Sequence, residues 1–160
     1  PTALVSLVDR DRQWFKSARG LQARETPRKS AFCAHAILAD QVPVVPDALL
    51  DPRFADNPLV TSDPHVRFYA GAPLTVESGH RVGTLCLIDH RPRELNDRDI
   101  RVLRELAAQV QQELHADRTT KLRRGVSSMP QVAEWSKNSL VNVEAGIDTA
   151  VHMHESLRVV

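Results

Sequence analysis

The spacing of apolar and polar positions predicts two strand pairs separated by a helix and a long connection. Residues 3–8 and 13–18 alternate apolar and polar side chains on either side of a short acidic turn, which is typical of an antiparallel hairpin. Residues 42–47 predict a short strand, and its prolines favour a sheet edge because proline has no N–H for a neighbouring strand. Residues 68–76 and 81–89 predict a second hairpin, whose later strand is apolar almost throughout, as expected of a central strand covered on both faces.

Two helices are predicted from capping residues and from apolar positions at three-four spacing. The first begins with Thr26 as N-cap and Pro27 in the first helical position, and it ends near Asp40. A connection rich in Asp, Pro and Asn follows over residues 48–67, and loops of this length are commonly functional. The second helix begins after Asn96 and has the stronger amphipathic pattern. Its apolar stripe comprises Ile100, Leu103, Leu106, Ala107, Val110 and Leu114.

A change of composition after the second helix divides the chain. Residues 1–116 predict one α/β domain, and residues 117–160 predict a basic connector followed by a C-terminal helix. The densest basic cluster, Lys121–Arg124, is expected to form a solvated surface. Ser128 and Pro130 are typical of the cap and first turn of the final helix.

Charge and cysteine content narrow the class of protein. The chain of 160 residues has 21 basic and 20 acidic side chains, a net charge of +1, which gives no sign of a nucleic-acid binder. No apolar run approaches the length of a membrane span, so we expect no membrane partner. Cys33 and Cys86, in a chain without a secretory signal, predict free thiols and a cytoplasmic protein. Free cysteines usually pack as small apolar side chains, and the alternative for this pair is a redox role.

Four segments of the chain are more specific than this general pattern: Phe32–Ile37, Val44–Ala48 with Asp51–Phe54, Phe68–Leu74 and Gly83–Asp89. In this order and at this spacing they resemble GAF domains, of the bacterial sensory kind found in front of histidine kinases and diguanylate cyclases. The resemblance extends from Pro1 to Leu114. It implies an α/β (α+β) fold whose central antiparallel sheet, of about five to six strands, has helices on one face and a small-molecule pocket under loops on the other.

The resemblance also implies a function. It implies a regulatory domain of bacterial signal transduction, such as a two-component system, which senses a small molecule or a redox change and is not itself an enzyme. It implies a homodimer formed through the terminal helices and an output domain that is a kinase or a cyclase, whereas the cofactor and the ligand stay unidentified. The scarce aromatic side chains, Phe15 and Phe68 among them, fall where the resemblance puts the pocket face or its roof. The residues predicted to bind the ligand are Trp14, Phe32, Cys33, His35, Phe54, Arg67, Tyr69 and Cys86.

The residues leave three alternatives open. A catalytic GAF domain of the free methionine sulfoxide reductase type uses several cysteines in one pocket, and this chain has two. Cys33 and His35 superficially resemble the thiol and histidine of bilin-binding relatives, but Ala34 separates them. A dimerisation module with an empty pocket fits the same pattern. No catalytic residue and no metal ligand is predicted, because His35, His65 and His80 show no fixed ligand spacing.

The resemblance leaves one part of the sheet without its usual cover. GAF domains normally start with a helix before the first strand, whereas this sequence begins at the strand itself. Burial of apolar surface stabilises a fold by roughly 25 cal/mol per Å², so an uncovered sheet face is unfavourable. We hypothesise that the tail helix, Met129–Leu157, folds back beside the Ile100–Leu114 helix and covers this face; a linker or a contact with a partner chain is the alternative.

Overall fold

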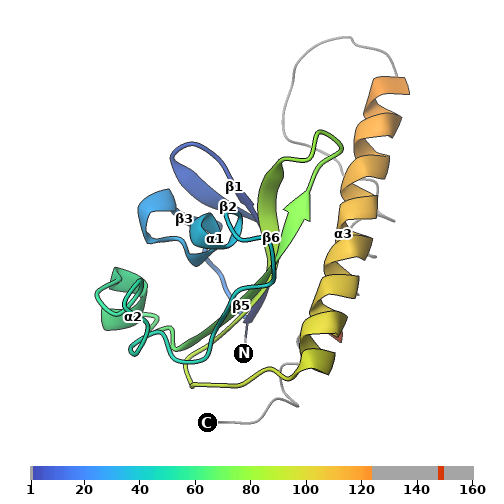
Figure 1. The fold of residues 1–160 in the computed structure, drawn as a ribbon. Coiled ribbons are helices and arrows are strands. Elements are labelled where there is room, and N and C mark those ends of the chain that lie inside the picture. The colour runs from blue at the N-terminus through green and yellow to red at the C-terminus, as the bar shows by residue number, and fades with distance from the viewer. Residues whose placement is uncertain (1, 124–147, 150–160) are drawn as a thin grey trace.

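The computed structural model describes residues 2–123 and 148–149, and its centre is an antiparallel sheet (Figure 1). In this part of the chain the sheet has six strands in the order β3-β2-β1-β6-β5-β4. The strands are β1 (Thr2–Val8), β2 (Arg12–Arg19), β3 (Glu25–Pro27), β4 (Val44–Val45), β5 (Phe68–Thr75) and β6 (Arg81–Asp89). The helices are α1 (Phe32–Ala36), α2 (Pro58–Thr61) and α3 (Asp97–Arg123), with a 3-10 turn, η1 (Arg28–Ser30), before α1.

Strands β1 and β6 lie in the middle of the sheet, as the apolar content of β6 predicts. They pair with each other in antiparallel register, Leu4 opposite Cys86. The two predicted hairpins are confirmed as β1–β2 and β5–β6. Strand β4 is the edge strand of the described sheet and pairs with β5, and an edge position tolerates the prolines on either side of it because no second strand needs their N–H groups.

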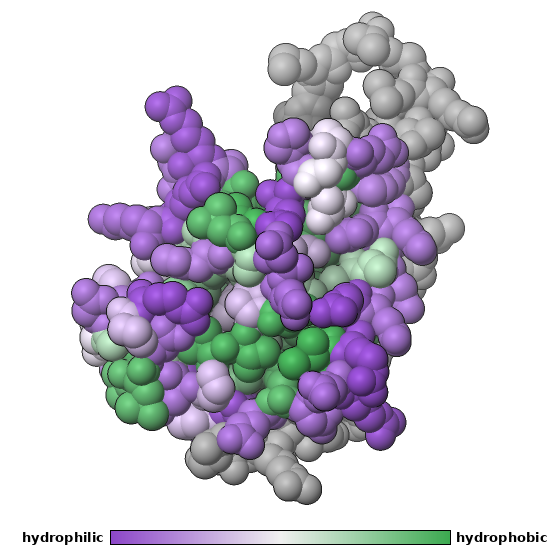
Figure 2. Space-filling view, viewed as in Figure 1, coloured by the Kyte–Doolittle hydropathy of each residue, from purple (hydrophilic) through white to green (hydrophobic). Residues whose placement is uncertain are grey.

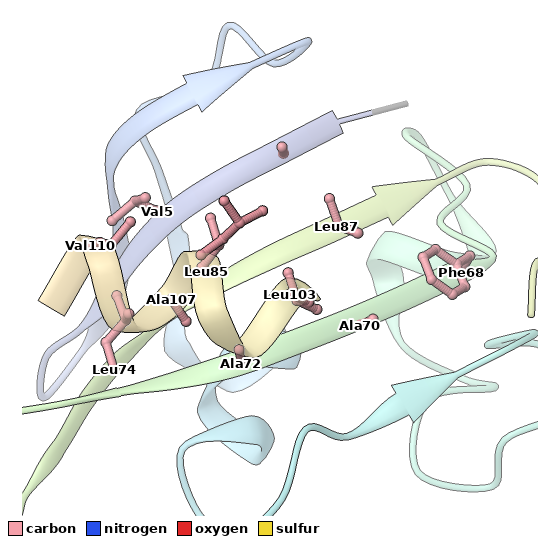
Figure 3. Packing of buried hydrophobic residues seen from close by; sticks show 12 residues of the cluster. Val5, Phe68, Ala70, Ala72, Leu74, Leu85, Leu87, Leu103, Ala107 and Val110 are labelled. Atoms are coloured by element: carbon pink, nitrogen blue, oxygen red, sulfur yellow. The ribbon is translucent and has the colours of Figure 1, made fainter. Parts of the chain in front are cut away.

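Helix α3 covers one face of the sheet (Figure 1). Asn96 caps it as predicted, because its side-chain oxygen accepts the backbone N–H groups of Arg98 at 2.9 Å and Asp99 at 3.0 Å. Figure 3 shows the apolar stripe of the helix, including Leu103 and Val110, above β1, β5 and β6. The buried side chains of this layer are Ala3, Val5, Phe68, Ala70, Ala72, Leu74, Leu85, Leu87, Leu103, Leu106, Ala107 and Val110.

The other face lies under α1, α2 and the long connection between β4 and β5, on the side of the sheet away from α3 (Figure 1). Neighbouring residues of one strand face opposite ways, so Leu4 and Cys86 contact this second layer while Val5 and Leu85 contact α3. The long helix therefore covers one face, and two short helices belong to the roof of the other. The buried side chains of the second layer are Leu4, Phe15, Phe32, Cys33, Ala36, Val45, Ala48, Phe54, Val60, Val66, Tyr69 and Cys86.

The predicted start of the first helix is wrong. Thr26 and Pro27 lie in β3, and Thr26 pairs with Gln13 of β2 instead of capping a helix. A proline is tolerated there because β3 is an edge strand. The α-helix that follows is short and ends at Ala36, before the predicted end at Asp40.

The second helix is longer than predicted. It continues to Arg123, through the first residues of the segment expected to be a connector. The predicted C-terminal helix and its packing beside α3 lie outside the described residues, apart from Asp148 and Thr149. Asp148 Oδ1 lies 3.4 Å from Arg19 Nη1 at the end of β2.

Hydrophobic surface occurs in patches bordered by hydrophilic residues (Figure 2). Leu38, Leu49 and Leu50 are the large apolar side chains that are exposed in the part of the chain that the structure describes. The other large apolar side chains in this part of the chain are buried or partly buried. None of the described helices is both long and apolar enough to cross a bilayer.

Candidate ligand-binding site

A cavity of about 310 Å³ lies on the sheet face opposite α3. It extends from β3 and β2 across β1 and β6 to α1 and to the segment around α2. Its size and its mainly apolar lining are typical of sites for small molecules. The apolar walls include Leu4, Phe15, Phe32, Leu59, Val66 and Ile88.

Two polar side chains at one end of the cavity each have an oxygen atom without a hydrogen-bond partner among the described residues. Gln13 of β2 and Thr26 of β3 are directly opposite each other and both line the cavity. Gln13 Oε1 and Thr26 Oγ1 are buried, and neither bonds to any group among the described residues. A buried polar group without a partner costs about 1–3 kcal/mol, so this pair is destabilising unless another molecule supplies the missing hydrogen bonds.

A cluster of thiol and hydroxyl groups lies beside the cavity, between α1 and the sheet. Cys33 Sγ is 3.6 Å from Cys86 Sγ, and it accepts hydrogen bonds from Thr84 Oγ1 at 3.1 Å and Tyr69 OH at 3.4 Å. Ser6 Oγ is 3.1 Å from Thr84 Oγ1 and extends the cluster. All five residues are buried, and both cysteines are free. Four hydrogen-bonding side chains thus surround one sulfur atom, that of Cys33.

These contacts distinguish the two thiols. Burial acts to raise the pKa of Cys33, but hydrogen bonds from Cys86, Ser6, Thr84 and Tyr69 outweigh it and lower the pKa to about 6. The pKa of Cys86 is raised well above its ordinary value by its hydrogen bond to Cys33 and by burial. Burial also raises the pKa of Tyr69. Of the two thiols, Cys33 therefore loses its proton more readily and is the one that forms a thiolate.

The structure brings part of the predicted residue set together. Phe32, Cys33 and Tyr69 line the cavity. Cys86 does not line it but contacts Cys33. Phe54 stacks on Phe32 with ring centroids 4.2 Å apart, so it supports a wall of the cavity from behind.

The remaining predicted residues lie away from the cavity lining. His35 packs its ring edge-on against Phe54, with centroids 4.9 Å apart. Arg67 Nη1 lies 3.6 Å from Asp47 Oδ1 in an ion pair. Trp14 is opposite Leu7 of β1 and alternates with Phe15, so it is on the sheet face that α3 covers.

The expectation that Phe68 faces the pocket is also wrong. Phe68 belongs to the layer under α3, while its neighbour Tyr69 lines the cavity. Two adjacent aromatic residues in one strand cannot share a face, because successive side chains point to opposite sides. The same rule separates Trp14 from Phe15.

The sequence reasoning missed the polar pair of the cavity, Gln13 and Thr26. The sequence does indicate that Gln13 faces the cavity, because residues two apart in a strand share a face and Phe15 is expected to face the pocket. Thr26 carried no such signal, since its segment also fits the start of a helix. Their juxtaposition depends on the pairing of β2 with β3, which only the fold shows.

The described residues contain no group of three or more His, Cys, Asp and Glu side chains placed to hold a metal ion. Asp63 and His90 line the cavity without forming such a group. The chemistry that the arrangement offers is therefore a mainly apolar enclosure with one uncharged polar pair, a thiol, and the side chains of Asp63 and His90.

An antiparallel sheet with a long helix on one face and a cavity on the other defines a small α+β domain. The chain belongs to the GAF domain family, because residues 2–114 match the sequence pattern of that family. GAF domains are generally regulatory parts of signalling proteins.

The chain is 50% identical over 121 residues to a cyclic di-GMP phosphodiesterase of Pseudomonas aeruginosa, covering 75% of this chain and 21% of that protein. The chain thus spans about a fifth of the length of this relative.

Two solved structures have a similar fold. One is a domain of a protein described as a two-component sensor histidine kinase from Sinorhizobium meliloti (TM-score 0.58, 18% identity, 78% of this chain and 86% of that chain). The other is the free methionine-R-sulfoxide reductase of Neisseria meningitidis in complex with its substrate (TM-score 0.61, 21% identity, 74% of this chain and 70% of that chain). At these identities the likeness concerns the fold alone.

Proposed function

We propose that this GAF domain senses a small molecule that binds in the cavity opposite α3, and that it is regulatory and not catalytic. The observation that supports the proposal is the pair of unpartnered oxygens, Gln13 Oε1 and Thr26 Oγ1, in a mainly apolar cavity. A fold that needed only stability would have apolar side chains at both positions, because a buried polar group without a partner is unfavourable. A ligand that bonds to the pair removes this cost.

The lining also restricts the chemistry of the ligand. Its apolar walls favour a mainly apolar molecule, and the uncharged amide and hydroxyl of Gln13 and Thr26 favour a neutral polar group at one end. Gln13 Oε1 accepts a hydrogen bond, so this group carries an N–H or O–H donor. A small uncharged molecule with one amide, lactam or hydroxyl end meets these conditions.

A single layer of sheet, including β1, separates the cavity from α3. Leu4 of β1 lines the cavity, and the adjacent residues Ala3 and Val5 contact the layer under α3. We propose that occupancy shifts the population of two positions of α3, and that α3 passes this shift to an output domain of the longer protein. The identity to a cyclic di-GMP phosphodiesterase supports an output in cyclic di-GMP signalling, and the kinase or cyclase output and the homodimer stay predictions.

The proposal is tested by thermal unfolding of the wild-type domain against a panel of small neutral amides and alcohols, with Gln13→Leu and Gln109→Leu as variants. A ligand raises the unfolding temperature by mass action. We expect at least one compound to stabilise the wild type and Gln109→Leu, whose substitution lies at an exposed position of α3, but not Gln13→Leu. Stabilisation that persists in Gln13→Leu would contradict the assigned site, and no stabilising compound would favour a dimerisation module.

A second candidate is an enzyme of the methionine sulfoxide reductase kind, and the contact between Cys33 and Cys86 supports it. The double variant Cys33→Ser/Cys86→Ser separates the two. Turnover of free methionine-R-sulfoxide by the wild type and its loss in the double variant would establish the enzyme. A sensor shows no turnover, and its ligand still stabilises the double variant.

A further inference from the structure

We infer that Cys33 and Cys86 are a peroxide-reactive dithiol, in which a peroxide that enters the cavity oxidises Cys33 and the two sulfurs then join in a disulfide. The oxidation uses the same cavity but does not require the ligand proposed above. It rests on the contact between the two sulfurs, on the access that the cavity gives to one of them, and on the hydroxyl groups around that sulfur.

The first argument is distance. The two Sγ atoms are 3.6 Å apart although the residues are separated by 53 positions in the chain. A disulfide has its sulfurs about 2.0 Å apart, so a small approach of α1 to β6 closes the bond. Helix α1 has five residues, so this approach needs the displacement of one short element and no rearrangement of the sheet.

The second argument is access. Cys33 lines the cavity, whereas Cys86 does not and is fully buried. A small oxidant that enters the cavity therefore meets Cys33 first. Cys86 is placed to act second, as the thiol that resolves the oxidised Cys33.

The third argument is chemical activation. The thiolate is the reactive form of cysteine, and hydrogen-bond donors stabilise it. Thr84 Oγ1 and Tyr69 OH both donate to Cys33 Sγ, at 3.1 Å and 3.4 Å. Cys86 shares Thr84 but has no bond from Tyr69, and its raised pKa means that it keeps its proton until the second step.

The reaction balances with hydrogen peroxide as the oxidant. The Cys33 thiolate attacks one peroxide oxygen, the O–O bond breaks, and the leaving hydroxide takes up a proton to give water and Cys33 sulfenic acid. The sulfur of Cys86 then attacks the sulfur of Cys33, the S–O bond breaks, and the leaving oxygen takes the Cys86 proton and departs as water. Two thiols lose one electron each, and the peroxide becomes two waters.

The test measures the oxidation products of the whole 160-residue chain. The reduced protein is treated with a small excess of hydrogen peroxide, alkylated, and examined by intact-mass and peptide mass spectrometry. We expect the wild type to lose two hydrogens and to contain a Cys33–Cys86 linked peptide that a dithiol reductant reverses. Cys86→Ser should stop at a Cys33 sulfenic acid that dimedone traps, and Cys33→Ser should leave Cys86 unmodified.

Three results would overturn the inference: free thiols in the treated wild type, a Cys33 sulfinic acid beside a free Cys86, or a disulfide between two chains. Because a serine variant can misfold, Tyr69→Phe provides a second test that keeps both thiols and the ring. It removes one donor to Cys33, so the disulfide should form several-fold more slowly. An unchanged rate in Tyr69→Phe together with an unmodified Cys33 in Cys86→Ser would equally contradict the inference.

Discussion

At the residue scale, the chemistry of the domain depends on side chains that ordinary core packing does not explain. Gln13 is buried with one unpartnered oxygen, and Cys33 is buried with donors on several sides. In a core optimised for stability alone, such groups are replaced by apolar side chains of similar shape. Substitutions at Gln13 and Cys33 are therefore expected to impair function without lowering stability.

We expect Gln13→Leu to stabilise the unliganded domain. The substitution removes a buried oxygen that has no hydrogen-bond partner and adds apolar contact in the cavity. The free energy of unfolding should rise by about 1 kcal/mol, measured by urea denaturation of both proteins. A fall of similar size would mean that the Gln13 side chain already has its partners in the free domain.

We expect the oxidation of Cys33 to depend on pH. The pKa of Cys33 is lowered to about 6, so the reactive thiolate is lost below that pH and predominates above it. The titratable side chains that touch Cys33 are Tyr69 of β5 and Cys86 of β6, and both keep their protons in this range because their pKa values are raised. His35 of α1 packs against Phe54.

The measurement is the rate of disulfide formation at a fixed peroxide concentration across this range of pH. The rate should increase as the pH rises and should level off above about 6. A rate that is flat in this range and rises only toward the ordinary pKa of a thiol, about 8.5, would contradict the activation of Cys33 by its neighbours.

At the element scale, the short helix α2 holds one wall of the cavity in place. Asn57 Oδ1 accepts the Leu59 N–H at 2.9 Å, and Asn57 Nδ2 donates to Ser30 O at 3.1 Å. One side chain thus caps α2 and ties it to the segment before α1. Leu59 itself lines the cavity, so the position of this wall depends on Asn57.

We expect Asn57→Ala to loosen α2 without disturbing α3, and Asn96→Ala to do the opposite. Each variant loses a helix N-cap, which lowers the free energy of unfolding by about 1 kcal/mol. Hydrogen exchange should become faster in residues 58–66 for Asn57→Ala and in the first turn of α3 for Asn96→Ala. The same exchange pattern in both variants would show that the two regions open together.

The turn between β6 and α3 contains a buried ion pair. Arg93 Nε and Nη2 both lie 2.7 Å from Asp89 Oδ2, and Asp89 is 4% exposed and Arg93 8% exposed. The Arg93 N–H also donates to Pro46 O at 3.1 Å. Through Arg93, the pair joins the end of β6 to the segment that follows β4.

We expect Arg93→Met to destabilise the domain by about 3 kcal/mol, because the Asp89 carboxylate stays buried after the charge of the Arg93 guanidinium is lost. The matched control is Arg53→Met, since Arg53 pairs with Asp51 at a half-exposed site and should contribute little. Chemical denaturation of the three proteins measures the difference. Equal small losses in both variants would show that water reaches the Asp89 site.

At the scale of the whole molecule, the sequence predicts the layers better than it predicts the cavity. Alternation and apolar content place β1, β2, β5 and β6, and the three-four stripe places α3, because each pattern is a local consequence of burial. The segment from Thr26 is misassigned because a proline suits both the start of a helix and an edge strand. Local sequence cannot distinguish a helix start from an edge strand here, because the difference depends on whether a neighbouring strand is present to pair with the segment.

The same limit applies to the candidate site. Phe32, Cys33 and Tyr69 are found through the motifs around them, whereas the pairing of Gln13 with Thr26 and the contact of Cys33 with Cys86 each join distant parts of the chain. Trp14 and Phe68 are misplaced because aromatic character was given more weight than strand alternation. A cavity is a property of the assembled layers, and no single segment contains it.

The position of β1 next to β6 makes the sheet a union of two three-stranded halves, β3-β2-β1 and β6-β5-β4. One ladder joins the two halves, and it pairs residues that are far apart in the sequence: Thr2 is opposite Ile88, and Leu7 is opposite Gly83. The cavity straddles this seam, because Gln13 and Phe15 belong to one half and Tyr69 and Ile88 to the other. A molecule bound there contacts both halves and so stabilises the ladder between them. Its binding should therefore slow hydrogen exchange most at the amide protons of the β1–β6 ladder.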